Sequence, residues 1–145
     1  MSDKFNLSQL TQEIISSQLK GSPDAPSMAA EIAKKTIVAG VRGTQTSGQI
    51  PQETVEQICL GAMKGLLLLE KDLPKAAVHI LNRMAEASSE LHMDPEEMMT
   101  WAMRGISRIT PLVSTDIRWN IQRAIEDQYM GAGEVFARLC GEISS

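Results

Sequence analysis

The chain has 145 residues, enough for one domain with a hydrophobic core, and 43% of them are hydrophobic while 22% are charged. Its net charge of −4, without any long basic cluster, argues against a nucleic-acid-binding protein. Aromatic residues make up only 3%, whereas there are nine methionines, so we expect an aliphatic helical core rather than a sheet.

Helical periodicity runs through nearly the whole chain, without the alternating pattern of strands. A first helix is expected at about 6–19, with Asn6 as its N-cap. A second is expected at about 27–42, and the polar residues after it favour Gly43 as its C-cap. Residues 43–51 are therefore expected to form a loop.

The third expected helix, at about 51–69, raises the question of a membrane span. It holds a G-x-x-x-G pair, Gly61 and Gly65, followed by four leucines, a combination found in paired membrane helices. Its apolar run covers about 12 residues and is interrupted by Lys64, whereas a spanning helix needs roughly 20. We therefore expect a buried amphipathic helix and no transmembrane segment.

Three further helical regions are expected along the rest of the chain. The fourth helix runs over about 74–91. The sequence D-P-E-E at 94–97 then gives the clearest start signal, with an N-cap, a first-turn proline and a capping-box glutamate. The last region runs from about 115 toward 143, and Gly131 and Gly133 are expected to bend or split it.

A shift of 40 residues aligns two parts of the chain. C-L-G-A-M-K-G-L-L-L-L at 59–69 falls on M-T-W-A-M-R-G-I-S-R-I at 99–109, and the same shift pairs Arg83 with Arg123. This suggests two related hairpins of about 40 residues, the length of HEAT and armadillo repeats. The alternative is coincidence between two amphipathic helices. Two copies are fewer than a solenoid usually needs, so we expect a compact bundle.

The predicted organisation is thus one all-α domain, 1–145, a bundle of about six helices. Its parts are an N-terminal helix pair at 5–50, a first hairpin at 51–91, and a second hairpin with a C-terminal extension at 95–145. Glycines inside helices lower helix stability, so a close helix neighbour is the expected compensation. We therefore predict helix-packing roles for Gly61, Gly65 and Gly105.

Both tryptophans lie off the expected core faces of their helices. Trp101 shares a stripe with Met98, and Trp119 lies almost opposite the apolar stripe of the last region. Tryptophan is enriched at protein interfaces, so Met98, Trp101 and Trp119 are predicted to form a partner-binding surface, with a homodimer as the simplest partner. The alternative is that these helices are buried on two sides within one chain.

The sequence shows no motif for catalysis, for a cofactor or for a metal. His79 and His92 lack the spacing of helical metal ligands, and there is no phosphate-binding or nucleophile-elbow glycine motif. The isolated Cys59 and Cys140 read as buried thiols, and the N-terminus does not resemble a signal peptide, so a cytoplasmic location is expected.

We therefore expect a non-enzymatic protein-interaction or oligomerisation module. Two alternatives remain open at this point. The first is a carrier or sensor of a small apolar ligand in a methionine-lined core, and the second is amphipathic association with a lipid or polymer surface. A small enzyme with an unrecognised site is a further possibility.

Overall fold

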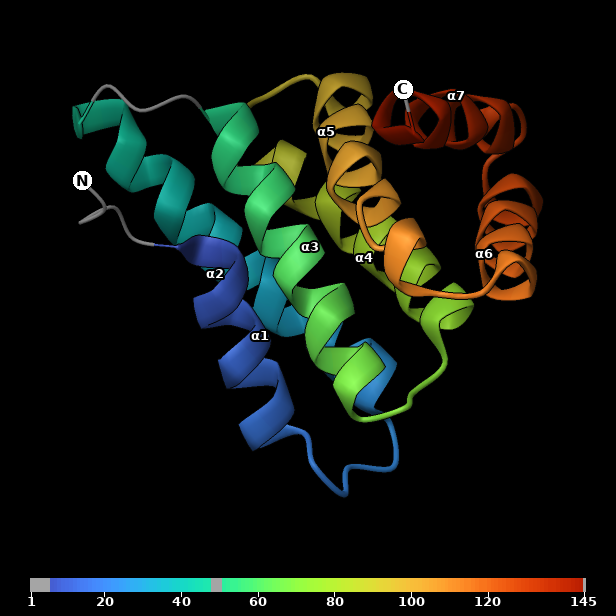
Figure 1. Ribbon diagram of the computed structural model, residues 1–145. Helices are drawn as coiled ribbons and strands as arrows, with labels where there is room; N and C mark the ends of the chain where they lie inside the picture. Colours follow the sequence, from blue (N-terminus) through green and yellow to red (C-terminus); the bar gives the residue numbers. More distant parts are fainter. Residues whose placement is uncertain (1–5, 48–50, 145) are drawn as a thin grey trace.

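The computed structural model describes residues 6–47 and 51–144, and in this part of the chain the regular secondary structure consists of helices joined by short connections (Figure 1). Its helices are α1 (Leu7–Gln18), α2 (Ala25–Ser47), α3 (Pro51–Leu68), α4 (Leu73–Glu90), α5 (Pro95–Ser107), α6 (Thr115–Gln128) and α7 (Ala132–Ser144). A short 3₁₀ turn, η1 (Thr110–Leu112), connects α5 to α6. The helices pack against one another, which confirms the expected all-α bundle.

Capping side chains and first-turn prolines mark most of the helix starts. Asn6 Oδ1 accepts a hydrogen bond from Gln9 N at 3.1 Å at the start of α1. Asp94 Oδ1 accepts one from Glu96 N at 3.0 Å before α5, and Pro95 is the first residue of that helix. Such caps satisfy backbone N–H groups that have no partner within the helix, and they explain why these boundaries can be found in the sequence.

The C-terminal helical region is two helices rather than one. Gly131 has a φ of +91°, a left-handed conformation that glycine adopts without strain, and it separates α6 from α7. The split that the sequence allowed at this glycine therefore occurs, and the described residues contain seven α-helices where about six were expected.

The expected end of the second helix is wrong. Helix α2 continues through Gly43 to Ser47, so Gly43 is a helical residue and not a C-cap. The polar residues after it disfavour burial but do not prevent a helix, and the next proline comes only at Pro51. Residues 48–50 of the expected loop lie outside the described residues.

The helices are arranged as two rows. Helices α1, α3, α5 and α7 contact one another in that order, and α2, α4 and α6 do the same. Contacts between the rows, mainly α2 with α3, α4 with α5 and α6 with α7, close the bundle (Figure 1). Helices α3 and α4, although consecutive, contact each other less than each of them contacts the helix two positions away. The 40-residue duplication stays a prediction.

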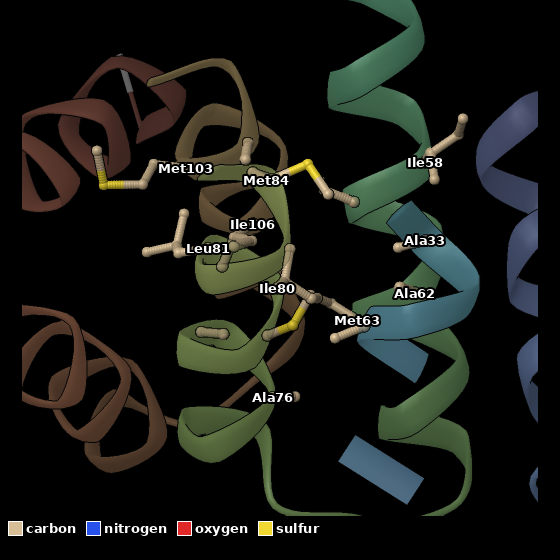
Figure 2. Packing of buried hydrophobic residues seen from close by; sticks show 14 of the residues in the cluster. Ala33, Ile58, Ala62, Met63, Ala76, Ile80, Leu81, Met84, Met103 and Ile106 are labelled. Atoms are coloured by element: carbon tan, nitrogen blue, oxygen red, sulfur yellow. The ribbon is translucent and has the colours of Figure 1, made fainter. Parts of the chain in front are cut away.

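The core fills the space between the two rows. Figure 2 shows part of it, with side chains from α2, α3, α4 and α5. Met63, Ile80 and Met84 are fully buried there, so methionine and aliphatic side chains replace the aromatic residues that the chain lacks. In the described part of the chain, every helix is too short or too polar to cross a membrane.

Candidate functional site

The three glycines singled out from the sequence lie at helix crossings. A Cβ atom on Gly61 would lie 2.3 Å from the backbone oxygen of Ser8 in α1, and one on Gly105 would lie 2.3 Å from that of Glu56 in α3. A Cβ atom on Gly65 would lie 2.6 Å from the side chain of Ile15. No side chain fits at these distances, so the glycines allow α1, α3 and α5 to approach closely.

The structure separates the three residues that the sequence assigned to a partner surface. Met98 is fully buried, and Trp101 is partly buried against the core, because α5 packs against α3, α4 and α7. Trp119 on α6 is 56% exposed. Met98 therefore does not belong to a partner surface, and the expectation from its helical face is corrected.

The expected patch is also not continuous across α5 and α6. Helix α6 packs mainly against α4 and α7, whereas α5 and α6 have little contact despite following each other in sequence. Of the predicted residues, Trp119 alone is left as a largely exposed aromatic side chain.

Trp119 lines an open groove of about 440 Å³ between α6 and the start of α7. The residues of this α6–α7 groove are Trp119, Gln122, Arg123, Glu126, Met130, Gly131, Gly133 and Glu134. Met130 is 95% exposed, so the groove presents two large apolar side chains to solvent. The sequence analysis missed Met130, although its place directly before the helix-splitting Gly131 was a usable signal.

Glu126 holds the two sides of the groove together. Its two carboxylate oxygens accept hydrogen bonds from Gly131 N and Gly133 N, each at 2.9 Å. A Cβ atom on Gly133 would lie 2.8 Å from Glu126 Oε1, so α7 starts directly against α6. These contacts fix the first turn of α7, and with it the shape of the groove.

A second cluster, which the sequence analysis also missed, surrounds Glu56 on α3. Its side chain is only 7% exposed, and its carboxylate lies 2.9 Å from Arg108 Nη2 and 3.6 Å from Arg104 Nε. Gln52 donates a further hydrogen bond of 2.7 Å, and Arg104 also binds Glu142 on α7 at 2.7 Å. This Glu56 cluster joins α3, α5 and α7, and its cations are already paired.

A third, more exposed cluster joins α2 to α4. Lys34 lies 3.2 Å from Glu86 and 2.7 Å from Glu90, and Arg83 bridges Glu86 and Glu31. The hydrogen bonds that Lys34 donates to Glu90 and Glu86 raise the pKa of Lys34, and the hydrogen bonds that Glu86 accepts from Arg83 and Lys34 lower the pKa of Glu86. The pocket beside this cluster is lined by three cations, Lys34, Lys35 and Arg42, of which Lys34 and Lys35 form ion pairs with glutamates.

The two cysteines are poorly suited to nucleophilic chemistry. Burial raises the pKa of the Cys59 thiol far above its ordinary value, and the charge of Glu56 adds to this. Burial also raises the pKa of Cys140, which Thr110 and Arg118 only partly oppose. A reactive cysteine needs the opposite shift. Within the described ranges, no three His, Cys, Asp or Glu side chains are grouped so that they could hold a metal ion.

The α6–α7 groove thus differs from the other two clusters in having exposed apolar side chains as well as charged ones. Concave surfaces of this kind are common binding sites. Comparisons of this chain with protein-family models, with curated proteins and with solved structures give no match.

Proposed function

We propose that this chain is a non-enzymatic protein-interaction module that binds its partner through the α6–α7 groove. The observation that carries the proposal is the exposure of Trp119, at 56%, and of Met130, at 95%, in one groove. Tryptophan side chains at the centre of an interface are often worth about 2 kcal/mol or more. Water-exposed Trp and Met side chains in one concave surface favour a protein partner.

The resolved pKa shifts favour a non-catalytic role. The resolved pKa shifts of Lys34, Arg83 and Glu86 accompany surface ion pairs, and those of Tyr129 and the cysteines come mainly from burial. These are ordinary consequences of packing and pairing, whereas active sites usually move a group toward reactivity at neutral pH. A cytoplasmic location remains part of the proposal and rests on the sequence alone.

Site-specific photo-cross-linking tests the proposal directly. Met130 is replaced by the photoreactive amino acid benzoylphenylalanine in living cells, and Leu68, 60% exposed at the end of α3, receives the same residue as a matched control. We expect discrete cross-linked protein adducts from position 130 and none from position 68. Adding Trp119→Ser should remove the adducts. Equal adducts from both positions, or none from position 130, would contradict the proposal.

A further inference from the structure

The exposed face of α6 carries a short pattern that is complementary to itself. Trp119, Arg123, Asp127 and Met130 are all exposed and follow one another at spacings of four, four and three residues. Trp119, Arg123 and Asp127 have the spacing of side chains on one side of a helix, whereas Met130 follows the extended Tyr129 beyond the end of α6 and lines the same groove as Trp119 and Arg123. These four residues are called the α6 stripe below.

The charged side chains of the α6 stripe are not used in salt bridges within the described part of the chain. Among residues 6–47 and 51–144, neither Arg123 nor Asp127 forms a salt bridge. Glu126 beside them is occupied by the N–H groups of Gly131 and Gly133. The stripe therefore offers one exposed cation and one exposed anion between two apolar side chains.

We propose that the occupant of the α6–α7 groove is a second copy of this chain, paired through antiparallel α6 helices about a twofold axis. This inference rests on the proposed function and names its partner. The axis passes between residues 124 and 125, so that each Trp119 packs on Met130 of the other copy. The same register places each Arg123 within one residue of the position that faces Asp127 of the other copy, close enough for the two charges to pair, and both contacts occur twice.

The charge pattern selects this arrangement over the parallel one. Two parallel helices about a twofold axis would set Arg123 against Arg123 and Asp127 against Asp127, and like charges directly opposed are unfavourable. The antiparallel register turns both repulsions into attractions. It also covers the two most exposed large apolar side chains of the groove, Trp119 and Met130, with each other.

The dimer formed in this way is weak. A single pair of short helices buries less than the roughly 800 Å² per partner of a standard stable interface. We therefore expect a dissociation constant on the order of 100 µM, which concentrated protein solutions reach. Because the contacting side chains are exposed in the single chain, their substitution should leave the fold intact.

The register is tested by reversing charges of the α6 stripe. The mass of each variant is measured by sedimentation equilibrium at protein concentrations from about 10 µM to 1 mM. The parent chain should sediment as a monomer at the low end and approach dimer mass at the high end. Arg123→Asp and Asp127→Arg should each weaken association by at least about tenfold. The double variant restores opposite charges and should associate within about threefold of the parent. Arg138→Asp, on exposed α7 surface outside the stripe, is the control and should associate like the parent.

The outcomes separate this inference from the proposed function. A parent chain that remains monomeric at 1 mM overturns the second-copy proposal, even if position 130 cross-links to a different protein in cells. The register is overturned if both single variants dimerise as tightly as the parent. It is also overturned if the double variant stays monomeric. Circular dichroism of each variant should match the parent and verifies that loss of association is not loss of folding.

Discussion

Helices α3 and α6 show how position in the bundle decides what a helix can do. Helix α3 lies in the middle of its row, between α1 and α5, and ten of its 18 residues are buried. Helix α6 lies at the end of the other row, packed against α4 and α7, and two of its 14 residues are buried. The inner helix therefore has less surface left for a partner than the edge helix.

The two helices also differ in what their polar residues do. The carboxylate of Glu56 on α3 is buried and paired with Arg104 in α5 and Arg108 directly after it. Arg123 and Asp127 on α6 are exposed and, within the described residues, form no salt bridge. A tryptophan on the buried side of α3 would disturb the packing of the neighbouring helices. Trp119 on α6 is exposed and can contact a partner.

The largest effect is expected where α3 approaches its neighbour most closely. Gly61→Ala places a Cβ atom 2.3 Å from Ser8 O, and backbone must move to accept it. We expect a loss of about 2–4 kcal/mol in the free energy of unfolding, measured by urea denaturation. Gly43→Ala is the matched control, since its Cβ meets nothing within 4 Å, and it should stabilise by about 0.5–1 kcal/mol. Equal stability of the two variants would show that α1 and α3 are not packed as described.

A smaller effect is expected from the buried charge of α3. Glu56→Gln keeps the size of the side chain but removes the charge that pairs with Arg104 and Arg108. We expect a loss of about 1–3 kcal/mol, because hydrogen bonds to a charged group are replaced by weaker ones and the arginines are partly exposed to water. Glu86→Gln, in the exposed α2–α4 cluster, should cost clearly less. The reverse order would contradict a structural role for the Glu56 cluster.

Thiol labelling compares the inner and edge regions within one molecule. Cys59 on α3 and Cys140 on α7 are both buried. Local opening of an edge helix costs less free energy than opening of an inner one, so Cys140 should react at least about tenfold faster with a thiol reagent under native conditions. Because burial raises the pKa of both thiols, both rates should increase with pH. Equal rates would mean that the bundle opens as one unit.

The smallest effect concerns the way α3 and α6 end. Glu70 follows α3 with a φ of +57°, whereas the corresponding left-handed residue after α6 is Gly131, with a φ of +91°. A non-glycine residue is strained there, so Glu70→Gly should stabilise by about 0.5–1 kcal/mol. Gly131→Ala should destabilise by a similar amount, and thermal denaturation of both variants measures the difference. A Glu70→Gly variant less stable than the parent would indicate that the Glu70 side chain contributes more than its strain costs.

The sequence was sufficient for features that depend on a few neighbouring residues. The caps at Asn6 and Asp94 and the break at Gly131 are local, and the structure confirms them. The sequence predicted that Trp119 lies outside the buried face of its helix. Trp119 is indeed exposed, because α6 is buried mainly on one side. A helical wheel assumes a single buried face, which holds for an edge helix.

The same assumption fails for α5. That helix contacts α3, α4 and α7, so Met98 is buried although it lies off the main apolar stripe. The Glu56 cluster was missed for a related reason, since a glutamate beside Val55 gives no hint that α5 will bring two arginines to it. The available signal for this cluster was the four-residue spacing of Arg104 and Arg108, which places both on one side at the end of α5. The burial of Met98 and the pairing of Glu56 both depend on residues that lie far away in the sequence.

The two-row arrangement has a consequence for the order in which the chain folds. Lys34 and Glu86, which link α2 to α4, are 52 residues apart, and Asn82 and Tyr129, which link α4 to the end of α6, are 47 apart. Among the described residues, no extensive contact joins α1 or α2 to α6 or α7. Helices α1 to α4 can therefore dock while the ribosome is still making the rest of the chain. The edge bearing Trp119 is made later, so a nascent chain can bury the part of its core formed by α1 to α4 before it presents this surface to its neighbours.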